Sequence, residues 1–195
     1  MTLQLTKKHD FDIVFDSQKV FRHILDVMSN PGKTVNIRAH SDKLSGSYAA
    51  TIAIAMTLLD NEVSFNTCGN HVLESEITSL TLAGPVSVQA ADFIFVSDMC
   101  HIENVIENAK CGILTDPHKS ATILIQNDDE PVCRVMLSGP GIDKQAEIML
   151  TQLARYTITK RDEQNYEYPQ GIDLLFITGA GDLFAIPRLT RMEVL

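Results

Sequence analysis

Asp173 and Arg188, near the end of the chain, are an acid and a base with the chemistry to form an ion pair or to hold a small anion. Strand alternation places the Asp173 side chain on the same face as Leu175 and Ile177, a face that we expect to be buried. A buried carboxylate without a partner is costly, and a guanidinium satisfies it with two hydrogen bonds. The pair is therefore either a structural ion pair at the end of a sheet or part of a site in which Arg188 holds an anion.

A β-hairpin is the element that would bring these two side chains together. Residues 172–186 predict two strands joined by a turn at Gly179-Ala180-Gly181-Asp182, and Pro187 ends the second strand. A hairpin that is symmetric about the middle of this turn sets Asp173 directly opposite Arg188, with Cβ atoms roughly 5 Å apart. The same symmetry pairs Phe176 with Ala185 and Leu174 with Pro187.

A glycine-rich loop, Ser138-Gly139-Pro140-Gly141-Ile142-Asp143, is a second candidate for chemistry. Gly139 and Gly141 permit close backbone approach, and a helix predicted over residues 144–156, capped by Asp143, points its N-terminus at the loop. Such an N-terminus favours an anion such as phosphate or phosphonate. The spacing matches neither a P-loop nor a dinucleotide fingerprint, so the glycines indicate either an anion site or a tight turn.

Arg22 is a third candidate, on a helix predicted to begin at Asp16 or Ser17 and to end at about Ser29. Asp26 follows Arg22 by one helical turn, so Arg22 is either a surface charge paired with Asp26 or a cation directed at something else. No nucleophile or catalytic triad can be inferred from local sequence. The predicted anion-binding residues are therefore Arg22, Gly139, Gly141 and Arg188.

The elements that must position these residues alternate between strands and helices for the first two-thirds of the chain. Residues 1–15 predict an irregular N-terminal arm. Further helices are predicted over residues 48–59, 72–82 and 102–110, and strands over residues 33–37, 62–67, 93–96, 112–114, 122–126 and 132–137. The last two strands are predicted to form a hairpin, and residues 157–167 a polar link. This alternation indicates one α/β domain over residues 1–195, a three-layer αβα sandwich with a mixed sheet.

Composition excludes several classes of protein. The net charge of −9 argues against a nucleic-acid-binding surface, which needs a basic stripe. No run approaches the roughly 20 apolar residues of a membrane span, and the first residues do not begin a signal peptide, so we expect a cytoplasmic protein without a membrane partner. The four cysteines have no C-x-x-C spacing and the six histidines are scattered, so we expect no metal site, and buried cysteines that act as small hydrophobes.

Taken together, the motifs resemble the PhnH family, a subunit of the bacterial carbon–phosphorus lyase core complex of phosphonate metabolism. Singly these motifs are weak, but their order and spacing cover almost the whole chain. The matching stretches are residues 21–32 (FRHILDVMSNPG), 51–60 (ending TLLD), 138–142 (SGPGI), 168–173 (YPQGID) and 185–190 (AIPRLT).

The resemblance implies a fold similar to the large domain of pyridoxal-phosphate-dependent transferases, without that cofactor or its lysine. It also implies a homodimer that joins other subunits of the lyase core. That complex couples a phosphonate to ATP and releases adenine, giving a ribose 1-phosphonate 5-triphosphate. The displacement is ascribed to a partner subunit, so the resemblance implies an accessory or non-catalytic role for this chain, with ATP and phosphonate as substrates of the complex.

Two departures from the family pattern affect the candidate site. Ser120 stands where the family tends to have glycine, and Leu189, beside Arg188, stands where threonine or serine is common. Two other functions stay open at this point. One is a purely structural adaptor subunit without a ligand site, and the other is a stand-alone enzyme acting on small anionic metabolites.

Overall fold

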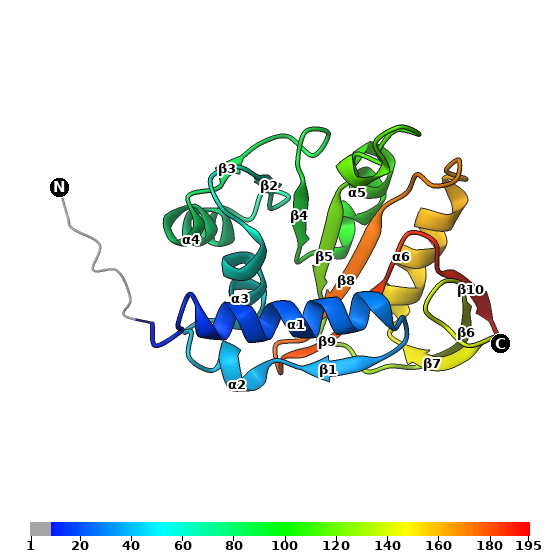
Figure 1. Cartoon of the computed structure of the whole chain (residues 1–195), viewed down its shortest axis with the longest axis horizontal. Helices are drawn as coiled ribbons and strands as arrows, with labels where there is room; N and C mark the ends of the chain where they lie inside the picture. The colour runs from blue at the N-terminus through cyan, green and yellow to red at the C-terminus, as the bar shows by residue number, and fades with distance from the viewer. Residues whose placement is uncertain (1–8) are drawn as a thin grey trace.

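A central seven-stranded mixed sheet forms the middle of the molecule (Figure 1). The computed structural model describes residues 9–195. The strand order is β1 (Thr34–Asn36), β9 (Asp182–Ile186), β8 (Asp173–Ile177), β5 (Thr122–Gln126), β4 (Phe93–Val96), β2 (Ser64–Asn66) and β3 (Gly84–Pro85). Strands β3, β2, β4, β5 and β8 are parallel, and β9 is antiparallel to both β8 and β1.

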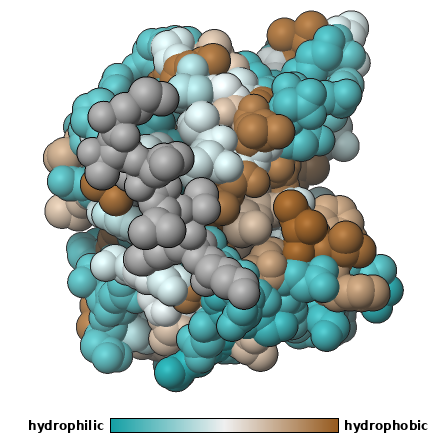
Figure 2. Space-filling model, turned by 90° about the vertical axis from the view of Figure 1, so that its left-hand side faces the viewer, coloured by the Kyte–Doolittle hydropathy of each residue, from teal (hydrophilic) through white to brown (hydrophobic). Residues whose placement is uncertain are grey.

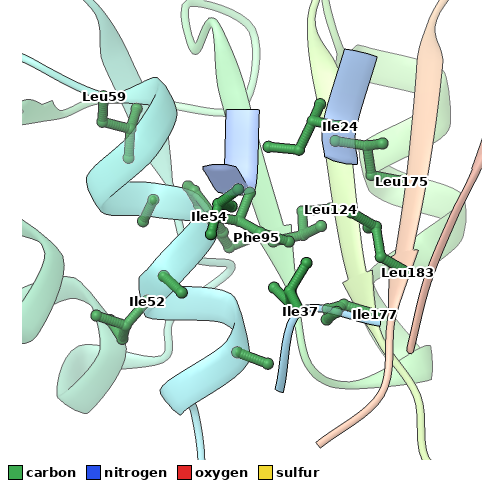
Figure 3. Packing of buried hydrophobic residues seen from close by; sticks show 14 of the residues in the cluster. Ile24, Ile37, Ile52, Ile54, Leu59, Phe95, Leu124, Leu175, Ile177 and Leu183 are labelled. Carbon is green, nitrogen blue, oxygen red and sulfur yellow. The ribbon is translucent and has the colours of Figure 1, made fainter. Parts of the chain in front are cut away.

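Helices cover both faces of this sheet, which confirms the predicted three-layer αβα sandwich. On one face lie α1 (Phe15–Ser29), α2 (Arg38–Ser41), α3 (Ala49–Leu58) and α4 (His71–Thr81), and on the other α5 (Ile102–Asn108) and α6 (Gln152–Glu163). Two short 3-10 helices, η1 (Met99–His101) and η2 (Pro117–Lys119), follow the carboxyl end of β4 and precede β5. Figure 3 shows the first of the two cores, where Ile24 of α1 and Ile54 of α3 lie among residues of the sheet.

The central strands are apolar on both faces because both faces are covered. Along β5, Leu124 packs in the core beneath α1 and α3, whereas Ile123 packs in the core beneath α5 and α6. Along β8, Leu175 and Leu174 divide in the same way. Continuous apolar runs of this kind are typical of parallel strands buried on both sides. The run at residues 122–126 therefore has its predicted boundaries.

A second, three-stranded antiparallel sheet has the order β10 (Arg191–Val194), β6 (Cys133–Ser138) and β7 (Ala146–Leu150). The prediction of a hairpin between residues 122–126 and 132–137 is therefore wrong. Both edges of β5 are already occupied, by β4 and β8, so the chain leaves the central sheet after β5 and pairs β6 with β7 and β10.

The predicted helix over residues 144–156 is also wrong. Its first part is strand β7, and helix α6 begins only after Thr151, whose hydroxyl accepts a hydrogen bond from the Ala154 backbone N–H at 3.0 Å. Ala, Glu, Met and Leu are good helix formers, but pairing with β6 outweighs this weak preference. Because α6 extends to Glu163, residues 157–163 are helix rather than the predicted polar link.

Helix α1 begins at Phe15, so the prediction that Asp16 or Ser17 caps its N-terminus is wrong. A carboxylate oxygen of Asp12 accepts hydrogen bonds from the backbone N–H groups of Val14 and Phe15, at 2.9 Å each. Asp16 is buried instead and anchors α1, through an ion pair with Lys43 at 2.7 Å and a contact with His40 at 2.8 Å. Residues 1–8 of the predicted N-terminal arm lie outside the described residues.

The remaining short strand predicted over residues 112–114 does not form. Ile113 and Leu114 are exposed, and the only pairing nearby is an isolated bridge between Cys111 and Ser120. Several other large apolar side chains are exposed, and Figure 2 shows hydrophobic patches among hydrophilic residues on one face of the molecule. Within residues 9–195, no helix has both the length and the apolar character needed to cross a membrane.

Candidate functional site

The β8–β9 hairpin forms as predicted, but its register differs by one residue. Leu174 opposes Ile186 and Phe176 opposes Phe184, with stacked rings 4.7 Å apart. The loop closes with a hydrogen bond from the Thr178 N–H to the Asp182 carbonyl, so an odd number of residues separates the strands. The hairpin is therefore centred on Ala180 and not on the peptide bond between Ala180 and Gly181. Gly181, with φ of 88°, supplies the left-handed residue that such loops favour.

Asp173 and Arg188 are nevertheless in contact. The Arg188 backbone N–H and Nε donate to one carboxylate oxygen of Asp173, at 2.8 and 3.2 Å, and Nη2 contacts the other oxygen. Arg188 Nη1 donates to the carbonyl of Pro117 in η2. The long arginine side chain compensates for the shifted register, and the guanidinium is held from both sides by the protein itself.

The region around Arg188 has little free space. The depression has a volume of about 20 Å³, which is enough for about one water molecule. Binding of a phosphonate there requires the Asp173–Arg188 contact to open. Its lining residues are Arg161, Asp162, Tyr166, Tyr168, Gln170, Arg188, Leu189 and Arg191.

Arg161, which the sequence analysis did not single out, holds the segment that carries Arg188. Its side chain is 1% exposed and donates to the carbonyls of Ile186 and Pro187, each at 3.1 Å, and of Thr190 at 2.8 Å. The Asp162 carboxylate balances its charge, at 2.8 Å. Because residues 157–167 were predicted to be a polar link, no pattern marked Arg161 as buried. A correct boundary for α6 would have revealed an arginine on its inward face.

The glycine loop is packed against protein rather than open to a ligand. A Cβ added at Gly139 would lie 2.8 Å from the Leu189 carbonyl oxygen, and one added at Gly141 would overlap the carbonyl oxygen of Ser29. The loop therefore lies between the end of α1 and the segment that follows Arg188. Strand β7, not a helix, follows the loop, so the prediction that a helix N-terminus lies behind it is wrong.

Arg22 lies apart from the other candidates on the exposed side of α1. Asp26, its predicted partner, pairs instead with Lys33 at 2.7 Å. Arg22 is two helical turns before Ser29, roughly 10 Å along the axis from the glycine loop. The structure thus brings Gly139, Gly141 and Arg188 into one region, with Arg22 outside it, and anion binding by these residues stays a prediction.

Asp173 and Arg188 lie at the amino ends of the parallel strands, because Asp173 is aligned with Thr122 of β5 and Phe93 of β4. Ligands of open α/β sheets bind at the opposite edge, outside the carboxyl ends of the strands. Two larger hollows lie there, of about 330 and 600 Å³, on either side of the loop that follows β4. The acid and base predicted from the sequence, Asp173 and Arg188, therefore lie at the amino edge of the sheet, which has less free volume than the carboxyl edge.

The cysteines and histidines do not converge in the described part of the chain. Among residues 9–195, no three His, Cys, Asp or Glu side chains are grouped so that they could hold a metal ion. All four cysteines are unpaired. Cys100 is exposed and Cys68, Cys111 and Cys133 are partly exposed, contrary to the expectation that each is buried. Burial raises the pKa of the Cys68 thiol to about 11, with a smaller contribution from Cys100.

The similarity of the chain to known proteins extends over all of the motifs. A family model described as "Bacterial phosphonate metabolism protein (PhnH)" matches residues 9–193. The chain belongs to the PhnH family. This confirms the predicted family, and PhnH membership assigns the chain to bacterial phosphonate metabolism.

A relative from Stutzerimonas stutzeri, named "Putative C-P lyase subunit protein HtxG", is 24% identical to this PhnH chain over 180 residues. The alignment covers 91% of this chain and 86% of the relative. The similarity of PhnH to the large domain of pyridoxal-phosphate-dependent transferases stays a prediction.

Proposed function

We propose that this PhnH chain is an accessory subunit of a carbon–phosphorus lyase complex that couples a phosphonate to ATP with release of adenine. The observation that carries the proposal is the family match over residues 9–193, supported by a relative whose name is that of a C-P lyase subunit. The chain acts there as a homodimer in the cytoplasm, joined to other lyase subunits. ATP and phosphonate are substrates of the complex, and the chain carries no cofactor of its own.

Exposed apolar side chains support a role in assembly. Helix α1 presents Phe15, Phe21 and Leu25, which are 64%, 44% and 48% exposed. Phe21 and Leu25 are four residues apart and therefore adjacent on the helix surface, and contiguous exposed apolar groups are typical of surfaces that meet other proteins. Such a surface suits a subunit whose contribution is to complete a complex.

The test is reconstitution. The chain is purified alone and together with lyase partners, and adenine release is measured with ATP and methylphosphonate. We expect the chain to co-purify with its partners and adenine release to fall when it is omitted. A chain that neither associates with the partners nor changes adenine release contradicts the proposal. Turnover of a phosphorylated substrate by the chain alone favours a stand-alone enzyme instead.

A purely structural adaptor is the second candidate, and the occupied guanidinium of Arg188 favours it. Its Nε, Nη1 and Nη2 atoms already donate to Asp173 and Pro117, which leaves little hydrogen-bonding capacity for a phosphonate. Arg188→Ala separates the two readings, with Arg38→Ala, at an exposed arginine of α2, as the matched control. For an adaptor, activity follows the amount of assembled complex. For a ligand-binding residue, activity falls while assembly is unchanged.

A further inference from the structure

The carboxyl edge of the central sheet contains a point where the chain reverses its direction across the sheet. Strands β2 and β4 are neighbours, but β2 continues through α4 to β3 on its outer side, whereas β4 continues through α5 to β5 on the other. The two connections diverge and leave a crevice outside the strand ends. In open α/β sheets this is the position where ligands bind.

The crevice is bordered by a hollow of about 330 Å³ at the carboxyl ends of β4 and β5, a volume at the lower end of the usual range for small-molecule sites. Its lining comes from four separate segments: the start of α3, the residue after β4, the last residue of β5 and the loop that follows β5. Among the described residues that line it, none is Lys or Arg. The lining residues are Ser47, Tyr48, Ser97, Gln126 and Asp128.

Asn70 holds the two hydroxyl groups of this lining in place. Its Nδ2 donates to the Tyr48 hydroxyl at 2.9 Å and to Ser97 Oγ at 3.1 Å, while its Oδ1 accepts from the Leu73 N–H as the cap of α4. Since both hydroxyls accept a hydrogen bond from Asn70, each keeps its own proton to donate. The hydroxyls of Tyr48 and Ser97 are thus a preorganised pair of donors at the crevice.

Gln126 contributes an amide that hydrogen bonds hold in place, and Asp128 contributes a carboxylate oxygen that can accept a hydrogen bond. The Thr51 hydroxyl donates to Gln126 Oε1 at 2.7 Å, and Gln126 Nε2 donates to the Ser47 carbonyl at 3.2 Å. Asp128 Oδ1 accepts from the Gly179 N–H of the β8–β9 turn, and Oδ2 is left as an acceptor. This carboxylate, unlike Asp173, has no arginine or lysine beside it in the lining.

We propose that this crevice binds the vicinal hydroxyl groups of an uncharged sugar, such as the ribosyl group of a nucleoside. A carboxylate accepts two hydrogen bonds from a diol, as an acidic residue does with ribose in dinucleotide-binding folds, and neighbouring hydroxyls donate to the sugar oxygens. A free phosphate or phosphonate does not suit the site, because Asp128 repels it and no lining cation offsets the charge. The inference goes beyond the proposed function, since it concerns binding by this chain alone and holds or fails whether or not the chain joins a complex.

The test is isothermal titration calorimetry of the isolated full chain with adenosine, with 2′,3′-dideoxyadenosine and with inorganic phosphate. We expect saturable binding of adenosine, at least about tenfold weaker binding of the dideoxy analogue, and no competition by phosphate, since hydrogen bonds to a charged group are the stronger kind. This comparison uses the unaltered protein and does not depend on whether a variant folds. Absence of adenosine binding, equal binding of the two nucleosides, or displacement of adenosine by phosphate overturns the proposal.

Variants then assign the binding to the crevice. Ser97→Ala should weaken adenosine binding by about fivefold, the effect of one neutral hydrogen bond, and Asp128→Asn should weaken it more. Asn at position 128 keeps an oxygen for the Gly179 N–H, so the turn is preserved. Ser75→Ala, at an exposed serine of α4, is the matched control and should leave binding unchanged. Wild-type affinity in both folded crevice variants places adenosine elsewhere and overturns the assignment.

Discussion

Replacement of Arg161 should destabilise the protein more than replacement of any exposed arginine. The Arg161 guanidinium is 1% exposed and donates to the carbonyls of Ile186, the last residue of β9, and of Pro187 and Thr190, which connect β9 to β10. In Arg161→Ala these carbonyls lose the hydrogen bonds from the guanidinium, although the Pro187 carbonyl keeps the one from the Thr190 N–H, and the Asp162 carboxylate loses its partner.

The size of the expected loss in stability follows from the burial of the Arg161 guanidinium. Breaking a buried charge pair by removing one partner costs about 3–5 kcal/mol, and part of the desolvation cost of the orphaned carbonyls is included in that figure. Because the Asp162 side chain is 25% exposed and stays partly solvated, we expect Arg161→Ala to lower the free energy of unfolding by about 3 kcal/mol, the lower end of this range. Arg161→Lys keeps the charge but not the planar fork that reaches several acceptors, so it should lose about 2 kcal/mol, the contribution of a hydrogen bond to a charged group.

The assay is urea denaturation followed by circular dichroism, with the free energy of unfolding taken by linear extrapolation. Arg134→Ala is the control, because Arg134 is 63% exposed in its ion pair with Glu147 and should change stability by less than about 1 kcal/mol. If Arg161→Ala falls within about 1 kcal/mol of wild type at an unchanged denaturant slope, the reasoning about the buried guanidinium is refuted.

Three further predictions concern backbone strain, pH and thiol chemistry. Gly141→Ala should lower the melting temperature, because φ is 84° and the added Cβ would overlap the Ser29 carbonyl; Gly84→Ala, where nothing lies within 4 Å of the added Cβ, should not, and equal effects would contradict this. Burial raises the pKa of Asp16, but hydrogen bonds from its neighbours outweigh this effect and hold the pKa well below its ordinary value of 3.8. The ionised carboxylate therefore stabilises the folded protein above about pH 3.8, and this stabilisation is lost as the pH falls below 3.8. Asp16→Asn should therefore lower the unfolding midpoint at pH 7, and the difference from wild type should shrink below about pH 4; a constant difference in urea midpoints would refute the assignment. Cys68, with a pKa raised to about 11, should alkylate slowly with iodoacetamide at pH 8, and labelling as fast as that of free cysteine, measured by peptide mass spectrometry, would count against its burial.

Much of the fold was predictable where local pattern and tertiary environment agree. The apolar runs of β4 and β5 predict strands that form at their expected boundaries, because nearly all of their apolar residues are buried. Helix α1 also forms close to its expected boundaries, but it buries Val20, Ile24 and Val27 and leaves Phe21 and Leu25 exposed. The segment 144–156 was not predictable in this way. Its helix-forming residues become strand β7 because β6 offers a pairing edge, a fact absent from the local sequence.

In the candidate site, too, the residues marked by local sequence were predictable and those defined by distant contacts were not. Composition and strand alternation were sufficient to mark Asp173 as a buried carboxylate that needs a base, and Arg188 is in contact with it even though the register differs by one residue. The sequence could not mark Arg161, because its importance lies in three carbonyls from a segment 25 or more residues away.

By itself, the sequence determined the family, the αβα class and the need of Asp173 for a partner, because these depend on motif order, on periodicity and on the cost of burying a charge. Only the tertiary structure decided which edge of the sheet each polar group occupies. Strand direction places Arg188 at the crowded amino edge and gathers Tyr48, Ser97 and Asp128 at the carboxyl edge, where the diverging connections of β2 and β4 leave space. Strand order and direction arise from pairing between distant segments, and a linear pattern of residues does not encode that pairing locally.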